Sequence, residues 1–402
     1  MSFRVLLALG VVAVLWVLER VNERRRQYAK TLILDTRAIA SFSYLREDLD
    51  CAQRLELRAI PNQRLASVFT IDNSFTTIDV GHHKEFLTRA TQVIQRVDDA
   101  AGWKRTFDAG VKAMQRADAH VRLKKTQGQS CIPLARIVRI VTWMTILHVL
   151  FDVDPADLAM EDVVTATETI NELWMQSKYC SYVLPVHQER LQSALHRMVP
   201  EHVGAREPGE NPLNLIMPAY ETMWRVVLLT FVSAAFRVSD KATMRLFRHV
   251  VQHVPECFGD SNEENKARAF AKEGLRLYPP TKRIYRGPPE NAMRADIEGC
   301  HRDPITWGAD ALKFRPFRFL SKLTEAQKNA YIPFSTKPHI CPAAHGFGER
   351  AIILLVAILA RHLGTRESGA RVRFGVQELN QNMDSVLPNS RDAAEGWVLI
   401  GR

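Results

Sequence analysis

The sequence has 402 residues, of which 46% are hydrophobic and 24% are charged, and this composition excludes a largely disordered chain. The net charge of +10 suits an anionic membrane surface or an acidic protein partner, while the lack of spaced Cys/His pairs and aromatic ribonucleoprotein motifs predicts no nucleic-acid partner. The six cysteines never form a C-x-x-C pair, which excludes a disulfide framework or a close-paired zinc site and favours free, reduced thiols.

Residues 1–22 are predicted to form a transmembrane signal-anchor. Residues 5–18 (VLLALGVVAVLWVL) carry no charge, and as a helix they cover ~21 Å of a hydrocarbon core that is ~30 Å thick. Positive charges follow at Arg20, Arg24, Arg25, Arg26 and Lys30. Positive charge stays cytoplasmic, so the body should face the cytosol. A cleaved signal peptide is the alternative, but no small-x-small cleavage site follows the apolar run.

Helical periodicity dominates the middle of the chain. Apolar residues recur at three- and four-residue steps over residues 84–97, 133–151, 161–176, 213–236 and 241–251. After Tyr278, repeated prolines predict short strands and loops. The run AIILLVAILA at residues 351–360 is too short to span a bilayer and reads as a buried helix. Alternation from Arg371 and from Trp397 predicts strands, so the fold class is mainly α with a small β portion.

Three short patterns occur in order in the second half of the chain. They are E-x-x-R at residues 273–276, FRPFRF at residues 314–319, and PFSTKPHIC at residues 333–341, which leads into the apolar helix. In this order and spacing they resemble the cytochrome P450 family, from about Ser67 to Arg402 and most closely after Leu275. The phrase IMPAYETMWR is similar to fungal, microsomal-type members. The resemblance implies a cytochrome P450 haem domain over residues 61–402, after a basic linker and poorly defined start at 23–60.

The resemblance implies that Cys341 is the axial ligand of the iron of haem b. A thiolate ligand donates electron density that favours O–O cleavage, and the helix that follows Cys341 stabilises a thiolate through its dipole. By resemblance, Phe334 packs near the haem, and Arg286 and His339 contact the propionates. Trp103 is a weaker propionate candidate, because Phe107 stands where the family has an Arg. Without the family pattern, Cys341 would be read as a buried structural thiol.

Two further sets of residues follow from the resemblance. Glu273 and Arg276 lie one helical turn apart and are expected to form a buried structural cluster with Arg318. Glu221 and Thr222 are expected over the iron, where Thr222 hydrogen-bonds the bound oxygen and Glu221 supplies protons through water. The alternative for Thr222 is a hydrogen bond to the preceding helical turn.

The sequence departs from the family pattern around the cysteine. Lys337, His339 and Ala343 replace two glycines and an arginine, and Phe317 replaces an acid. The chain is also shorter than typical eukaryotic members, with the shortfall before Thr222. The dinucleotide-like pattern at residues 346–351 follows no strand, so Rossmann binding is not expected. We expect the remaining histidine candidates to lie on the solvated surface; they are His82, His83, His187, His196 and His202.

The favoured function is a monooxygenase that oxidises a lipophilic small molecule with O2. The resemblance implies electrons from NADPH-cytochrome P450 reductase, an endoplasmic reticulum membrane location with a single span, and fungal secondary metabolism. Two alternatives stay open. One is an isomerase or dehydratase with the same fold that does not use O2, and the other is a catalytically degenerate, membrane-anchored binding protein. The substrate cannot be deduced, because the fold does not fix it.

Overall fold

The computed structural model describes residues 3–45, 48–123, 131–179, 184–202 and 210–400. The side chains of residues 3–12, 122–123 and 202 are also outside the description. Cys180, residues 1–2 of the expected anchor, and the side chains of His202 and of anchor residues 3–12 therefore lie outside the description.

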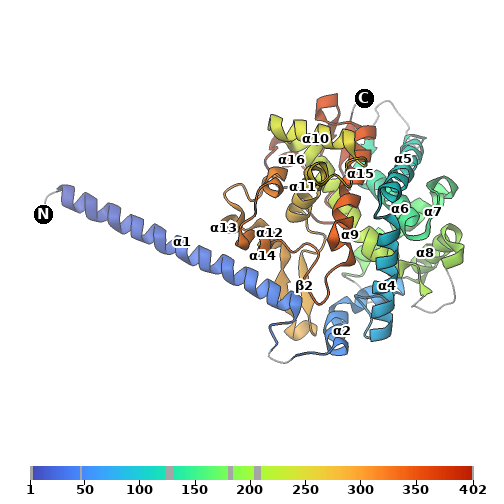
Figure 1. Cartoon of the computed structure of the whole chain (residues 1–402), viewed down its shortest axis with the longest axis horizontal. Coiled ribbons are helices and arrows are strands. Elements are labelled where there is room, and N and C mark those ends of the chain that lie inside the picture. The colour runs from blue at the N-terminus through green and yellow to red at the C-terminus, as the bar shows by residue number, and fades with distance from the viewer. Residues whose placement is uncertain (1–2, 46–47, 124–130, 180–183, 203–209, 401–402) are drawn as a thin grey trace.

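Helices make up most of the molecule, as the sequence predicted (Figure 1). Those of the first half are α1 (Phe3–Ser41), α2 (Cys51–Ala59), α3 (Gln63–Phe69), α4 (Val80–Val97), α5 (Ala100–Leu123), α6 (Leu134–Phe151), α7 (Met160–Gln176) and α8 (Pro185–Met198). Those of the second half are α9 (Leu213–Val232), α10 (Lys241–His253), α11 (Ser261–Leu277), α12 (Ile297–Arg302), α13 (Pro304–Trp307), α14 (Glu325–Ala330), α15 (Phe347–Leu363) and α16 (Gln377–Gln381).

The β portion consists of two small antiparallel sheets. One has the order β1 (Cys131–Pro133), β5 (Val398–Ile400), β4 (Arg371–Arg373), and its central strand joins the tail of the chain to the segment before α6. The other pairs β2 (Arg283–Arg286) with β3 (Met293–Asp296), so that Arg286 lies opposite Met293. The expected strands after Tyr278, at Arg371 and at Trp397 are therefore present.

The core is built around three apolar helices, α6, α9 and α15. Two segments, Leu134–Phe151 and Leu213–Arg237, are long and apolar enough to cross a membrane, but 78% of each is buried inside the protein. They are therefore core helices of the body. Pro218 lies inside α9 and has no N–H for the carbonyl of Asn214, which instead accepts a hydrogen bond from the Asn73 amide at 3.3 Å.

Helices α9 and α11 approach each other closely at Gly274. A Cβ atom built on Gly274 would lie 1.9 Å from the hydroxyl oxygen of Thr230 on α9. Only a residue without a side chain permits this contact. The close packing fixes the position of α11, and with it Glu273 and Arg276.

Helix α1 is a single helix of 39 residues, and its first half projects away from the body (Figure 1). Its side chains from Ala13 to Tyr28 are exposed, whereas Ala29, Ile33, Ile39 and Ala40 are buried against the body. The region from residue 23 onward, which we expected to be a linker, is thus helical as far as Ser41, and α2 occupies residues 51–59. The apolar run at 5–18 falls largely on residues whose side chains are not described.

Candidate active site

Cys341 lies in a loop that is fixed at both ends. Its N–H donates to the carbonyl of Phe334 at 3.0 Å, and its own carbonyl accepts from the N–H of Ala344 at 3.0 Å. A short 3-10 helix at Pro342–His345 follows, and Gly346, with φ +109°, starts α15. The ring of Phe334 packs on Gly348, where a Cβ would lie 2.9 Å from the ring. Phe334 therefore holds the cysteine loop against the first turn of α15.

The substitutions in this loop leave the backbone unstrained at the position of the missing glycine. The left-handed residue of the loop is Ser335, with φ +65°, and Lys337 is not among the described residues with positive φ. Positive φ thus occurs at Ser335, two positions before Lys337.

Cys341 is half-buried, and two groups oppose the effect of burial on the pKa of its thiol. Burial raises its pKa above the usual value, whereas the backbone N–H of Ala343 and the charge of Arg58 lower it. Arg58 is a residue that the sequence analysis did not single out. It belongs to α2, which is held by a capping box between Asp50 and Gln53.

Four basic side chains gather beside the cysteine loop, and we call them the basic cluster: Arg58, His83, Arg286 and His339. All four are buried, between 4% and 8% exposed. The N–H of Gly287 donates to the carbonyl of Leu57 at 3.0 Å, which ties the end of β2 to α2 and brings Arg286 near Arg58. The Arg286 guanidinium lies over the ring of Phe42 at 4.6 Å.

The basic cluster has no carboxylate partner among the described residues. In this part of the chain, no ion pair involves Arg58 or Arg286, and both ring nitrogens of His339 and the Nε of Arg286 have no hydrogen-bond partner. Burial and mutual repulsion lower the pKa of Arg58 to about 9 and that of His339 to about 3. Burial lowers the pKa of Arg286 to about 10. Buried arginine side chains without a carboxylate partner favour the binding of an anion.

These residues fit a haem group. The half-buried thiol of Cys341 could supply the soft ligand that haem iron takes, and the basic cluster beside it could supply cations and unpartnered donors for the two propionates. Arg286 and His339 were expected in this role, whereas Arg58 and His83 were not. The only sequence signal for Arg58 was the D-x-x-Q pattern at residues 50–53, which marks the start of a helix.

The prediction of a solvated surface position is wrong for His83. Its Nδ1 lies 3.0 Å from the hydroxyl of Ser74, and its ring packs edge-on against His339 with the centroids 5.3 Å apart. The prediction holds for His82 and His196, which are exposed, while His187 is half-buried near Glu172. The periodicity of α4 did not reveal that one of two adjacent histidines faces the cysteine loop.

Glu273, Arg276 and Arg318 come together in the interior. Glu273 and Arg276 are fully buried and share two hydrogen bonds of 2.8 Å, and the Arg318 Nε lies 3.5 Å from Glu273. Arg276 also donates to the carbonyls of His301 and Ala311, each at 2.7 Å. The cluster thus anchors the irregular segment that precedes the cysteine loop.

Thr222 and Glu221 take different environments on α9. The Thr222 side chain is exposed, and its hydroxyl donates to the carbonyl of Pro218 at 2.7 Å, which is the bond to the preceding helical turn. Glu221 is buried and forms an ion pair with Arg391 from the segment before β5. Arg391 lies against Trp174 and Trp224, with centroid distances of 4.7 and 5.8 Å. The sequence analysis did not identify Arg391.

Trp103 takes a core position. It is 2% exposed and packs against Phe258 and Phe347, each with ring centroids 5.3 Å apart. Its indole nitrogen lies 3.4 Å from Asp98. Trp103 thus belongs to the apolar core beneath α15, and its indole is engaged by the protein itself.

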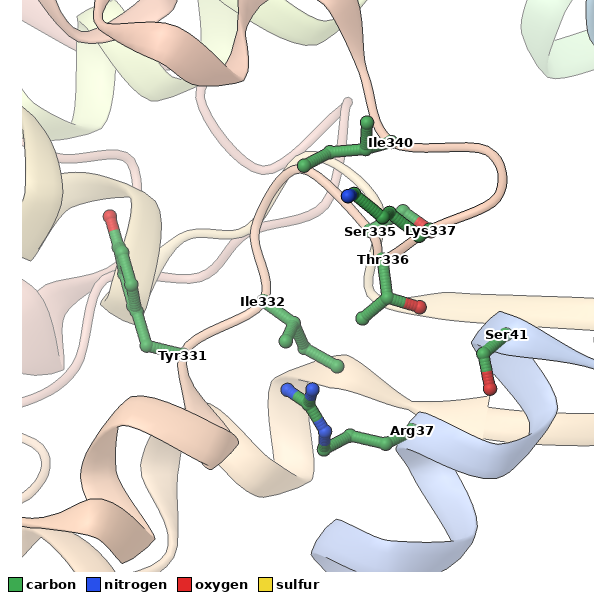
Figure 2. Close-up of a pocket in the computed structure, with 8 residues that line it drawn as sticks. All are labelled: Arg37, Ser41, Tyr331, Ile332, Ser335, Thr336, Lys337 and Ile340. Carbon is green, nitrogen blue, oxygen red and sulfur yellow. The ribbon is translucent and has the colours of Figure 1, made fainter. Parts of the chain in front are cut away.

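A cavity of about 430 Å³ lies between the end of α1 and the segment that leads to Cys341. Figure 2 shows Arg37 and Ser41 of α1 facing Ile332, Thr336 and Ile340 across it. Neither Cys341 nor Thr222 lines this cavity. It therefore lies on the outer side of the cysteine loop, away from α9.

Comparisons with known proteins agree with the fold. The family model described as Cytochrome P450 matches residues 250–350. The chain is 34% identical over 139 residues to flavonoid-6-hydroxylase from Mentha piperita, covering 30% of this chain and 27% of that protein. It is 35% identical over 103 residues to secologanin synthase 1 from Catharanthus roseus, covering 22% and 20%.

The matched segments span only 16% to 27% of the length of such relatives. Both of the named relatives are plant proteins, so the fungal character stays a prediction.

Solved structures share the fold over most of the chain. A six-coordinated cytochrome P450 from Thermus thermophilus has a TM-score of 0.53 at 14% identity, with 76% of this chain and 79% of that chain covered. A mutant cytochrome P450 heme domain has a TM-score of 0.52 at 13% identity, with 85% and 80% covered. Residues 250–350 thus match the cytochrome P450 family model, and most of the chain shares the fold of solved cytochromes P450.

Proposed function

We propose that the chain is a haem-thiolate monooxygenase that oxidises a lipophilic small molecule. The observation that carries this proposal is the half-buried Cys341 in the loop before α15, beside four buried basic side chains that find no carboxylate partner among the described residues. Related proteins named as a hydroxylase and a monooxygenase support the same reaction class. Haem ligated by a thiolate supplies the activation of O2.

The protein's own residues bind and orient the group and shape its surroundings. Cys341 would ligate the iron, and its loop is held by the bond to Phe334. Arg58, Arg286 and His339 would hold the propionates, with His83 packed behind His339. Glu273, Arg276 and Arg318 fix the approach to the loop from the interior.

On α9, Thr222 offers an exposed hydroxyl that can donate or accept a proton after it leaves the Pro218 carbonyl. Glu221 can deliver a proton only when its ion pair with Arg391 opens, because both oxygens face the guanidinium. We therefore assign Thr222 to the reacting oxygen and Glu221 to a gated proton supply.

The same proposal includes the membrane. Residues 5–18 of α1 would enter the bilayer of the endoplasmic reticulum as a single span, with the basic residues 20–30 at the cytosolic headgroups. Electrons would come from NADPH-cytochrome P450 reductase, an acidic partner for a body that carries net positive charge. Fungal secondary metabolism is the proposed setting.

Chemistry without O2 is the second candidate, and the Glu221–Arg391 ion pair favours it. A carboxylate held in a buried ion pair is a poor proton donor, and an isomerase or dehydratase would need no proton delivery to oxygen. Substrate-dependent consumption of NADPH with the reductase separates the two reactions. A degenerate binding protein is separated from both by its haem content.

The first experiment is the reduced carbon monoxide difference spectrum of the full chain in membranes. Wild-type protein should give the red-shifted Soret band of a thiolate ligand, and Cys341→Ala should abolish it. Cys257→Ala is the matched control, because Cys257 is a buried free thiol outside the cysteine loop, and burial raises its pKa to about 11. Absence of any haem signal from well-folded wild-type protein would contradict the proposed function.

A further inference from the structure

A second group of basic side chains surrounds Arg391, on a different part of the molecule from the cysteine loop. We call it the Arg391 cluster, and it consists of Arg64, Lys178, Arg225 and Arg391. Arg64 lies over the ring of Trp174 at 5.4 Å, and Arg391 lies over the same ring at 4.7 Å. Two guanidinium groups thus share one indole.

Helix α9 links this cluster to the proposed reaction site. Arg225 lies four residues after Glu221 and three after Thr222, so its side chain is a neighbour of each on the surface of the helix. Arg225 donates to the carbonyl of Pro280 at 3.1 Å, and Glu221 pairs with Arg391. A molecule bound by the cluster would therefore lie within reach of Thr222.

The charges of the cluster are not balanced within the described part of the chain. The Glu221 carboxylate attracts the charge of Arg225, and the Asp392 carboxylate attracts the charge of Lys178. Two carboxylates thus interact with a cluster of four basic side chains. Burial and repulsion from Arg391 lower the pKa of Arg225 to about 10, and they lower the pKa of Arg64. The Nε atoms of Arg225 and Arg391 are buried and have no hydrogen-bond partner among the described residues. Such a group binds an anion favourably.

The cluster also reaches the protein surface. Arg64 and Lys178 are exposed, whereas Arg391 is 3% exposed. The cations thus extend from the surface to the buried ion pair beside α9. The neighbouring surfaces are apolar and aromatic, with Trp174 half-buried and Trp224 buried. This arrangement suits a molecule with an apolar body and one anionic end.

We propose that the Arg391 cluster binds the carboxylate of the substrate, so that this protein acts on a lipophilic carboxylic acid. The planar guanidinium of Arg391 pairs with a carboxylate already, that of Glu221, and a substrate carboxylate would compete with or join it. This inference rests on the proposed function. It narrows the substrate class from lipophilic molecules in general to those with a carboxylate.

The test compares two ligands with the same alkyl chain, one with a charged and one with a neutral head group. Binding of dodecanoate and of dodecanamide to the full-length holoprotein is measured by calorimetry, and the haem spectrum is recorded on the same samples. Wild-type protein should bind dodecanoate at least about tenfold more tightly than dodecanamide. The double variant Arg64→Gln/Lys178→Gln, at exposed positions, should lose this preference and leave dodecanamide binding unchanged.

Two further variants sharpen the test. Lys322→Gln/Arg366→Gln removes the same charge at exposed positions elsewhere, and it should keep the preference. Glu221→Gln removes the competing carboxylate and should tighten dodecanoate binding.

Equal binding of the two ligands by wild-type protein would overturn the inference, as would equal weakening of both by the double variant. If wild-type protein shows the haem spectrum but no preference for dodecanoate, this inference is wrong and the proposed function stands. If wild-type protein prefers dodecanoate but shows no haem spectrum, the proposed function is wrong and the carboxylate site stands.

Discussion

At the scale of single residues, the ion pair between Glu221 and Arg391 is the contact with the largest expected effect on stability. The two side chains are 3% exposed each and lie 170 positions apart in the sequence. Glu221→Gln leaves a buried guanidinium without its counter-charge and should lower the free energy of unfolding by about 3 kcal/mol. Urea denaturation of the variant and wild type measures this difference.

The control is an exposed pair on α5, Lys104 and Asp108, for which Lys104→Ala should cost below about 0.5 kcal/mol. The double variant Glu221→Leu/Arg391→Leu should lose less stability than the sum of the two single leucine variants. Additive losses would mean that the two side chains do not stabilise each other.

His301 makes stability depend on pH. It is fully buried, its Nε2 accepts the N–H of Ile332 at 3.0 Å, and burial with the charge of Arg276 lowers its pKa to about 3. As the pH falls below ~6.5, the His301 imidazole is protonated in the unfolded chain but stays neutral in the folded protein. Stability should therefore fall between pH 6.5 and 3, by up to ~1.4 kcal/mol per pH unit from this residue.

The measurement is urea denaturation across this range for His301→Asn, which should show a shallower slope than wild type. His196→Asn, at an exposed position, should keep the wild-type slope. Identical slopes for all three proteins would rule out His301 as a source of the pH dependence.

The sequence predicted residues whose role follows from a local pattern and missed those defined by distant partners. Cys341 and the pair of Glu273 and Arg276 lie in short recognisable phrases. Arg58 and Arg391 do not, because each acquires its role from segments far away in the chain, such as the cysteine loop or α9. No periodicity of α2 or of the segment before β5 encodes those contacts.

At the scale of elements, the contact of α11 with α9 depends on Gly274. Alanine in an exposed helix would stabilise by ~1 kcal/mol relative to glycine, but here its Cβ would overlap the Thr230 hydroxyl. Gly274→Ala should therefore destabilise the protein by about 1–3 kcal/mol and displace the Glu273 cluster.

Thermal unfolding of holoprotein and the haem content of the variant test this prediction together. The second change Thr230→Ala removes the overlapping oxygen and should restore part of the lost stability. Stabilisation by Gly274→Ala alone would contradict the close approach of the two helices.

Helix prediction succeeded where one face or the whole helix is apolar. The expected ranges 133–151 and 241–251 correspond to α6 at Leu134–Phe151 and α10 at Lys241–His253. Helix α5, at Ala100–Leu123, was missed, although its buried residues Trp103, Phe107, Met114 and Val121 recur at helical spacing. The extension of α1 to Ser41 was missed because its buried face contacts β3 and α12, which come about 260 residues later in the chain.

At the scale of the whole molecule, the second half of α1 should be part of the folded body, and its first half should not. Ile33 packs in a cluster with Cys300, Trp307 and Ala330, and Ile39 is also buried. Removal of residues 1–22 should leave the thermal midpoint of the body unchanged. Removal of residues 1–42 uncovers this cluster and should lower the midpoint by roughly 10 °C or more.

A pair of substitutions in the full chain provides the matched control, measured by the same thermal unfolding. Ile33→Ala removes a buried side chain, and Leu34→Ala removes its neighbour, which is 56% exposed. Only the first should lower the midpoint, by a few degrees. Equal effects would show that α1 does not dock through the Ile33 face.

Helix α1 is continuous, so the number of residues between its two ends sets how the body is rotated about the helix axis. In the proposed arrangement, the anchor and the docked segment are one rigid rod, so a residue inserted after Glu23 turns the body about 100° around the rod and raises it by ~1.5 Å. Seven inserted residues would return nearly to the original azimuth, ~10.5 Å farther from the bilayer. The number of residues between the anchor and the body thus determines which side of the protein faces the lipid.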